Sequence, residues 1–251
     1  MNPVSGDIEI HNLSKAFMIR YNKTNSLKSK FVGMFHKRFR EEAQPLWVLR
    51  DINLTIQGGE VFGVIGKNGS GKSTLLRIMA GIYPPSSGEV RYPRGVRVGT
   101  MIDLGVGFHP ELTGRENIYL GGSVYGLTHK EIEEMYAAIV DFSELDGFID
   151  TPIKNYSSGM QARLGFALAL SLKPGLLLVD EVLAVGDEGF QRKCIGQMNQ
   201  FKRDGKTIVL VSHDPSTVGS FCDRVCVLDH GNQVYVGTPT EALDVYHKIL
   251  H

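Results

Sequence analysis

A glycine-rich stretch at residues 66–74, GKNGSGKST, has the residue types and spacing that phosphate binding requires. It lies between an apolar run, EVFGVIG, and a helical pattern, STLLRIMAGI. Glycines let backbone N–H groups curl around phosphate oxygens, and a helix that begins there directs its positive end at the anion. We expect Lys72 to meet the β- and γ-phosphates of ATP and Ser73 to bind Mg²⁺. The residues expected to form this site are Gly66, Lys67, Asn68, Gly69, Ser70, Gly71, Lys72, Ser73 and Thr74.

Two carboxylates end another apolar run, LLLVDE, at residues 176–181. Ligands of open α/β sheets bind at the carboxyl ends of the strands, so we expect Asp180 to join the Mg²⁺ shell. Glu181 is the candidate to polarise the attacking water. His213 follows a further apolar run, TIVLV, and is expected at the same sheet edge, where it can donate to the γ-phosphate or the water. The plain alternative is that these residues only end strands in solvent.

A second small-residue turn, YSSGM at residues 156–160, precedes the apolar helical pattern QARLGFALALSL. A capped core helix needs one serine, and Ser157 can be that cap. Ser157, Ser158 and Gly159 together offer a hydroxyl and free N–H groups, which predicts a second anion site. One chain need not bring the two anion sites together. Two chains related by a two-fold axis could, each giving its phosphate loop to one ATP and its YSSGM turn to the other.

Short strand patterns alternate with helical ones along the chain, which predicts an α/β fold with a parallel sheet covered on both faces. Two strand patterns near the N-terminus, DIEIHNL and WVLRDINLTI, are expected to form an N-terminal β part. A helix-rich block, about residues 113–174, interrupts the alternation and is interpreted as an inserted helical lobe. We expect residues 1–251 to form a single nucleotide-binding domain.

Composition narrows the classes of function. The 251 residues carry 27 Lys plus Arg and 27 Asp plus Glu. The chain therefore has no excess of basic residues that would favour nucleic acid as a partner. The longest apolar run, residues 164–172, is far short of the roughly 20 residues that cross a bilayer. The first residues lack a secretion signal, which places the chain in the cytoplasm and leaves any membrane role to a partner. Three cysteines are expected to be free thiols rather than disulfides or metal ligands: Cys194, Cys222 and Cys226.

The ordered set GKNGSGKS, YSSGMQARLGFALAL, LLLVDE and SHD resembles the ATP-binding subunit of ABC transporters, over about residues 8–236. This resemblance implies a P-loop ABC ATPase core whose N-terminal β part is antiparallel, ATP and Mg²⁺ as cofactors, and a homodimer that sandwiches ATP. YSSGM stands where the family has its LSGGQ signature. Ser157 and Gly159 match that signature, whereas Ser158 and Met160 depart from it.

Three further residues take roles from the resemblance. Phe17 lies where the family has an aromatic ring that stacks on adenine, with Tyr21 as the alternative. Asp187, in AVGD where the family has SALD, matches the D-loop residue that would touch the opposite site. The family's Q-loop glutamine is missing, and either Asp103 or Leu104 occupies that region; Asp103 is the candidate replacement as a Mg²⁺ ligand.

A narrower resemblance rests on LGVGFHPELTGRENI (104–118), YSSGM and DEVLAVGDEGFQRKC (180–194). These stretches are similar to the subfamily that exports O-antigen, capsule and teichoic-acid polysaccharides. The resemblance implies an integral membrane permease as partner, a polysaccharide cargo, and a peripheral position at the cytoplasmic face of the inner membrane. The alternatives are a soluble ABC-type ATPase acting on DNA or the ribosome, and the motor of an importer or a lipid exporter.

A basic insertion, about residues 20–45, separates the first two strand patterns. It is either a solvated insertion or a short amphipathic helix that faces the membrane partner or anionic headgroups. Its apolar residues at helical spacing are Leu27, Phe31, Met34 and Phe35, and its basic residues around them are Lys28, Lys30, Lys37 and Arg38.

Overall fold

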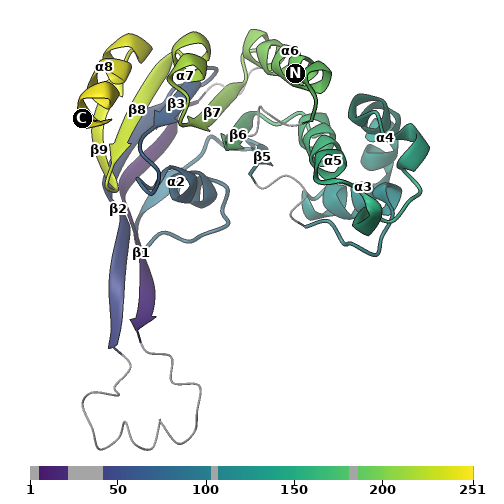
Figure 1. Ribbon diagram of the computed structural model, residues 1–251, viewed down its shortest axis with the longest axis horizontal. Helices are drawn as coiled ribbons and strands as arrows, with labels where there is room; N and C mark the ends of the chain where they lie inside the picture. Colours follow the sequence, from purple (N-terminus) through teal and green to yellow (C-terminus); the bar gives the residue numbers. More distant parts are fainter. Residues whose placement is uncertain (1–5, 22–41, 103–106, 181–185, 251) are drawn as a thin grey trace, which may run out of the picture.

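The computed structural model describes residues 6–21, 42–102, 107–180 and 186–250. Their strands form two sheets, and helices cover the larger one (Figure 1). The elements in chain order are β1 (Ile8–Tyr21), β2 (Glu42–Ile56), β3 (Val61–Ile65), α2 (Lys72–Met79), β4 (Ser87–Arg91), β5 (Val98–Met101), α3 (Gly114–Val124), α4 (His129–Ser143), η2 (Asp146–Phe148), η3 (Ile153–Asn155), α5 (Ser158–Ser171), β6 (Leu176–Asp180), α6 (Glu188–Arg203), β7 (Thr207–Ser212), α7 (Pro215–Phe221), β8 (Arg224–Asp229), β9 (Asn232–Gly237) and α8 (Pro239–Leu250).

The larger sheet has the order β5-β6-β7-β3-β8-β9. Its strands are parallel except for β9, which pairs antiparallel with β8. Alternate side chains of β3 enter different apolar clusters: Phe62 and Val64 face one side, and Val61 and Ile65 the other. The parallel sheet with two covered faces, predicted from the apolar strands, is therefore confirmed.

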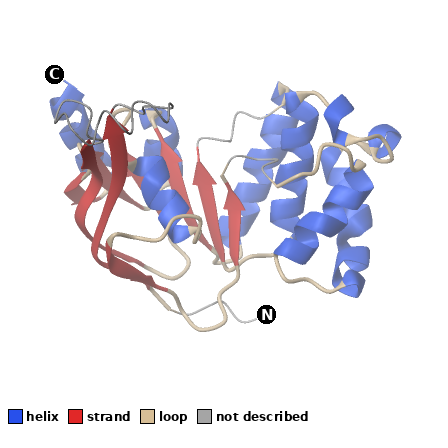
Figure 2. Cartoon of the chain, turned by 90° about the horizontal axis from the view of Figure 1, so that it is seen from below, coloured by secondary structure: helices blue, strands red, loops and turns tan. Residues whose placement is uncertain are grey.

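Different elements cover the two faces of this sheet. Helix α2 and the antiparallel sheet β2-β1-β4 pack on one face, and helices α5 to α8 pack on the other. Helices α3, α4 and α5 stand together beside the β5–β6 edge, as Figures 1 and 2 show. They share an apolar cluster of their own, and this group of helices is called the helical lobe below.

Hydroxyl caps set the starts of two helices in the helical lobe. Thr113 and Thr128 each accept a hydrogen bond from the backbone N–H three residues on, and the carboxylates of Glu116 and Glu131 accept one from the backbone N–H of the cap residue. Such capping boxes satisfy N–H groups that the first turn of a helix leaves without partners.

Strands β1 and β2 continue into the stretch that the sequence assigns to the basic insertion. Their pairing runs from Ile8↔Ile56 out to Tyr21↔Glu42, so both ends of the predicted range 20–45 are strand. The pairing of β1 with β2 therefore reaches into both ends of the predicted range, where the two strands extend each other by backbone hydrogen bonds. Residues 22–41, with the predicted amphipathic face and its basic side chains, lie outside the described residues.

The three cysteines are buried free thiols, as expected. Burial raises the pKa of Cys194, Cys222 and Cys226 to about 12, so all three are protonated at neutral pH. Within the described part of the chain, no helix is long and apolar enough to cross a membrane.

Candidate nucleotide-binding site

The glycine-rich stretch 66–71 joins β3 to α2, in the strand–turn–helix context that the sequence predicted. Gly71 caps α2 with φ 105°, a backbone region that favours glycine. A Cβ at Gly71 would lie 2.6 Å from Leu49 Cδ2, and a Cβ at Gly66 would lie 2.5 Å from Ser70 Oγ and overlap the backbone oxygen of Leu228. The fold of this chain therefore requires glycine at both positions.

The phosphate loop carries several hydrogen-bond donors. Lys72 is buried, and its Nζ donates to the backbone oxygens of Gly66 at 2.8 Å and of Lys67 at 3.1 Å. Ser70 Oγ is buried and has no hydrogen-bond partner among the described atoms. No side chain caps α2, so its first N–H groups also lack a side-chain acceptor. An anion such as a phosphate supplies the acceptors that these groups need, and the loop fits it.

A cavity of about 400 Å³ opens over this loop. Ser73 and Asp180 meet there, with Ser73 Oγ donating to Asp180 Oδ1 at 3.4 Å. A hydroxyl and a carboxylate are oxygen ligands of the kind that Mg²⁺ prefers, so this pair fits the metal. The residues that line the cavity are Val48, Asn68, Gly69, Gly71, Lys72, Ser73, Thr74 and Asp180.

Sheet register brings His213 to this edge. Asp180 pairs with Val211, and Ile65 pairs with Ser212, so His213 follows β7 beside the start of the phosphate loop. His213 is exposed. Glu181 follows Asp180 directly along the chain, but Glu181, Asp103 and Leu104 lie outside the described residues.

Phe17 is not among the described residues that line the cavity. Its ring packs edge-on against Tyr83 with the centroids 5.5 Å apart, and Lys15 Nζ lies 4.9 Å from its centroid. Val48 of β2 lines the cavity instead. No local sequence signal marks Val48, because β2 reaches the loop only in the folded chain, where Val48 and Leu49 both pack against Gly71. The side chain of Tyr21, the alternative to Phe17, lies outside the part of the chain that the structure describes.

The YSSGM turn begins α5, and Ser157 Oγ accepts a hydrogen bond from Met160 N at 3.2 Å. Tyr156 is buried and its hydroxyl donates to Phe148 O at 2.7 Å, whereas Ser157 and Ser158 are exposed. A Cβ at Gly159 would meet only Ser157 Oγ, at 3.8 Å. No residue of this turn is among those lining the Lys72 cavity.

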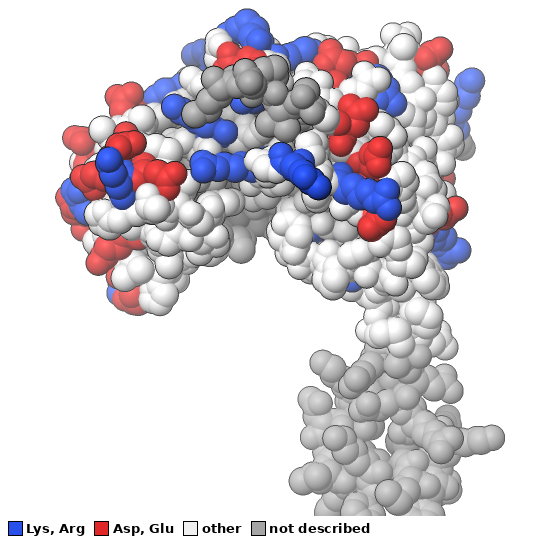
Figure 3. Space-filling view, turned by 180° about the vertical axis from the view of Figure 1, so that it is seen from behind, with Lys and Arg blue, Asp and Glu red and all other residues white. Residues whose placement is uncertain are grey.

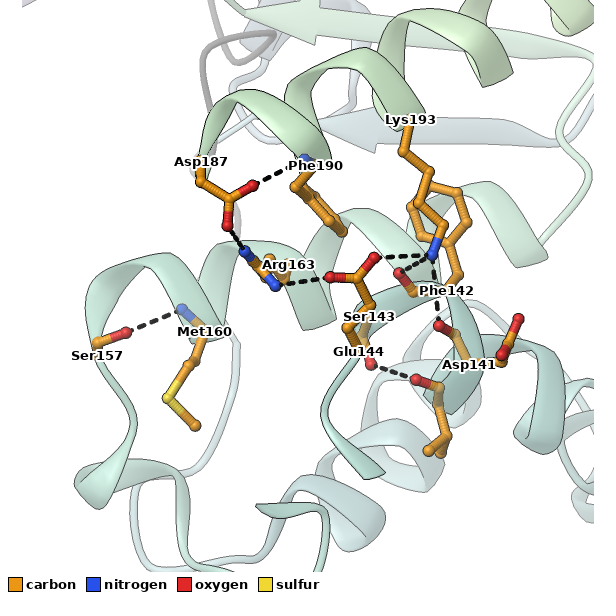
Figure 4. A network of polar contacts seen from close by, with 11 residues as sticks. Asp141, Phe142, Ser143, Glu144, Ser157, Met160, Arg163, Asp187, Phe190 and Lys193 are labelled. Carbon is orange, nitrogen blue, oxygen red and sulfur yellow. Dashed lines mark hydrogen bonds and ion pairs between the residues drawn. The ribbon is translucent and has the colours of Figure 1, made fainter. Parts of the chain in front are cut away.

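Asp187 caps α6, with Oδ1 accepting from Phe190 N at 2.9 Å (Figure 4). This hydrogen bond and the nearby Arg163 lower the pKa of the Asp187 carboxyl. Its other oxygen accepts from Arg163 Nη2. Sequence reasoning did not single out Arg163, and no local signal could have paired it with a residue 24 positions away.

The profile of the ABC transporter family matches residues 49–184. The chain belongs to the ABC transporter family. It is therefore an ABC-type ATPase and binds ATP.

Several relatives that are named as export ATP-binding proteins are similar to most of the chain. The O-antigen export system ATP-binding protein RfbB of Klebsiella pneumoniae is 41% identical over 253 residues, and the match spans 100% of this chain and 100% of that relative. The protein of the same name from Myxococcus xanthus is 47% identical over 214 residues, and the match spans 85% of this chain but only 48% of that relative. The teichoic acids export ATP-binding protein TagH of Listeria monocytogenes serotype 4b is 40% identical over 97% of this chain and 70% of its own length.

A solved structure shares the fold of this ABC ATPase. It is a dimeric ATP-binding cassette in a post-hydrolysis state, bound to ADP and Pi, with a TM-score of 0.71 and 23% identity. The match covers 92% of this chain and 98% of that one.

Proposed function

We propose that the chain is the ATP-hydrolysing motor of an exporter and works as a homodimer with two shared ATP sites. The observation that carries this proposal is the separation of two half-sites. The phosphate loop forms a cavity with its own Asp180, while the capped turn at Ser157 faces solvent. In a two-fold dimer each exposed turn would close the cavity of the other chain. The dimeric cassette with the same fold supports this arrangement.

The predicted site residues then have separate tasks in hydrolysis. Lys72 and the N–H groups of α2 bind and orient the phosphates, and Ser73 and Asp180 would hold Mg²⁺, which would neutralise phosphate charge. Glu181 takes a proton from the attacking water as general base, and His213 donates to the γ-phosphate. Asp103 remains the candidate further Mg²⁺ ligand, and Phe17 the candidate adenine contact.

Lipid-linked polysaccharide is the cargo that we propose, moved across the inner membrane from its cytoplasmic face. The printed names of three relatives support it, since they concern the export of O-antigen or teichoic acids. The chain would act there as a peripheral subunit.

A groove beside the helical lobe supports the proposal that a separate membrane-spanning protein binds this chain. Adjoining cavities of about 350 and 110 Å³ share Arg97, Leu127 and Leu172. Val124 and Tyr125, at the end of α3, are 78% and 41% exposed. Exposed apolar surface of this kind is typical of a docking site for another protein.

The charge of the described residues on one face of the molecule gives no support to nucleic acid as an alternative partner. On the face drawn in Figure 3, the described Lys and Arg side chains are interspersed with Asp and Glu instead of forming one basic field, and the surface is hollowed between the helical lobe and the sheet. Binding to a phosphate backbone would require clustered positive charge.

The experiment that tests the motor compares the wild type with Glu181→Gln. We expect the variant to bind ATP, to lose hydrolysis by about 100-fold or more, and to accumulate as a dimer with ATP. Phosphate release and light scattering measure the two effects. Hydrolysis by Glu181→Gln at the wild-type rate would contradict the assignment of the base.

Cargo needs a separate test in cells. Deletion of the gene is expected to remove a surface polysaccharide and to leave its lipid-linked precursor inside the cell. Wild-type protein is expected to restore the surface signal, and the Lys72→Ala variant to fail. Normal surface glycan after deletion would contradict polysaccharide export while leaving the ATPase intact.

A further inference from the structure

A buried amide in the helical lobe holds the backbone segment that precedes α3. Asn117 of α3 is 0% exposed, and its Oδ1 accepts a hydrogen bond from His109 N at 2.6 Å. Its Nδ2 donates to three backbone oxygens, those of His109 at 3.1 Å, Leu112 at 3.1 Å and Thr113 at 2.8 Å. One side chain therefore fixes residues 109–113 against the first turn of α3.

The segment that Asn117 fixes is hydrogen-bonded to the residues that lead to the YSSGM turn. Ile153 N donates to Leu112 O at 2.9 Å, and Lys154 N donates to Pro110 O at 2.9 Å. Leu112 O thus accepts from the Asn117 amide and from Ile153 N at once, which the two lone pairs of a carbonyl oxygen allow. Both backbone donors belong to η3, which directly precedes the turn.

A second contact joins α3 to the first residue of the turn. Tyr156 is buried, and its N donates to Ile153 O at 2.9 Å. A Cβ at Gly114, the first residue of α3, would overlap the hydroxyl of Tyr156. This hydroxyl therefore packs directly against the backbone of α3. Ser157 follows Tyr156 and is exposed, so the exposed part of the turn rests on a buried and hydrogen-bonded support.

A phosphate-binding turn needs a support of this kind. The hydroxyl and N–H groups at the start of a helix bind an anion only when they are directed at it. A misplacement of about 1 Å, caused far from the chemistry, can lower a rate by about 100-fold. The outer side of this turn, at Ser157 and Ser158, faces solvent, so its position depends on the contacts on its inner side.

We propose that Asn117 is a positioning residue for the YSSGM turn and that it acts, through this support, on the ATP held by the partner chain. This inference rests on the proposed function, in which the turn of one chain completes the phosphate-loop cavity of the other. Asn117 is not among the described residues that line the Lys72 cavity of its own chain. Its effect on hydrolysis is therefore expected at the partner's site and not at its own.

The test assigns Asn117 to one of the two half-sites by mixing variants of the purified full-length chain. Asn117→Leu keeps the size of the side chain but removes the hydrogen bonds of the amide. We expect hydrolysis by this variant alone to fall by at least about tenfold. Binding of a fluorescent ATP analogue is expected to change by less than about twofold, because the phosphate loop of the same chain is untouched.

Hybrid dimers then distinguish the two half-sites. In a mixture with Lys72→Ala, Asn117→Leu is expected to reach about a quarter of the wild-type rate when half of the dimers are hybrids, because one site of each hybrid is intact. In a mixture with Ser157→Ala, we expect no rate above that of Asn117→Leu alone, because every site then contains a damaged turn. Two different affinity tags verify that hybrids form in both mixtures.

A second variant at the same position covers the case in which Asn117→Leu does not fold. Asn117→Ser keeps a hydroxyl that can donate to the carbonyl four residues back, Thr113 O, but does not reach Leu112 or His109. Asn117→Ser is expected to lose less activity than Asn117→Leu and to show the same pattern in the two mixtures. Circular dichroism and Tm verify its folding.

Ser143→Ala is the matched control in the same lobe. Ser143 is also 0% exposed, but its Oγ donates to Val140 O at 2.9 Å, within α4. Loss of this buried hydrogen bond is expected to lower Tm, as in the Asn117 variants, and to leave hydrolysis within about twofold of the wild type.

The outcomes separate this inference from the proposed function. No recovery in the reference mixture of Lys72→Ala with Ser157→Ala would overturn the shared sites and, with them, this inference. Where the reference mixture recovers, recovery of the Asn117 variants with Ser157→Ala instead of Lys72→Ala would assign Asn117 to the ATP of its own chain and overturn the inference alone. Full activity of both Asn117 variants, recovery with neither partner, or losses of Tm and hydrolysis equal to those of Ser143→Ala would also overturn it.

Discussion

Two small-residue turns precede helices in this chain, and they use glycine for different reasons. In the phosphate loop before α2, a Cβ at Gly66 or Gly71 would collide with atoms of the same chain. In the turn before α5, a Cβ at Gly159 would meet nothing closer than 3.8 Å. The first turn lines a cavity together with Asp180 of the same chain, and the second is exposed.

The phosphate loop is thus packed within its own chain, whereas nothing in the described part of the same chain packs against the YSSGM turn at Gly159. Glycine inside a helix costs stability relative to alanine, and at Gly159 the packing of this chain gives no reason for that cost. Close approach of a phosphate from outside does give one. The proposed dimer, in which a second chain holds that phosphate, would account for the exposed turn.

The largest expected effect is that of Gly66→Ala, because its Cβ would overlap backbone that cannot move aside. We expect a loss of about 3 kcal/mol in the free energy of unfolding, together with the loss of ATP binding. Denaturant unfolding and nucleotide titration measure the two. Gly81→Ala, at positive φ but with open space around it, is the control and is expected to lose only about 1–2 kcal/mol. Equal losses of unfolding free energy in the two variants would contradict the packing argument.

The next effect concerns activity rather than folding. Lys72→Ala and Ser157→Ala are each expected to be inactive alone, because each damages both sites of a homodimer. When the two variants are mixed, their hybrid has one site damaged twice and one intact. About a quarter of the wild-type rate is expected if half of the dimers are hybrids.

Two different affinity tags verify that the hybrids form in this mixture. A rate no higher than that of either variant alone, with hybrids present, would contradict independent shared sites. Activity in either variant alone would contradict the role given to that residue.

The sequence predicted those parts of the fold and site that depend on local patterns. Apolar strands predicted the sheet, and the loop spacing predicted the surroundings of Lys72 and Ser73. The placement of Asp180 followed from the rule that parallel strands end at one edge. Contacts between distant segments had no such signal: Val48 at the cavity, Arg163 on Asp187, and the extension of β1 and β2 into the basic insertion all arise only from tertiary packing.

A smaller effect distinguishes a cap from a ligand contact. Ser157→Ala removes the acceptor for Met160 N–H and is expected to lower the free energy of unfolding by about 1 kcal/mol. Thr128→Ala removes a comparable cap at the start of α4 and is expected to cost about the same. Only Ser157→Ala is expected to lose ATP hydrolysis. If both variants keep it, Ser157 is a cap and nothing more.

The smallest effect on stability is expected for Gly159→Ala, and it has the opposite sign. With open space around the new methyl group, the helix gains up to about 1 kcal/mol. Gly196→Ala in α6 is the matched control, since Gly196 is also helical and a Cβ there would meet nothing within 4 Å. Both variants are expected to unfold at equal or higher denaturant concentration, whereas only Gly159→Ala loses ATP hydrolysis, because its methyl group would stand where the partner's phosphate approaches. A Gly159→Ala variant that is stabilised and fully active would show that this turn meets no ligand, and the two turns would then differ in packing alone.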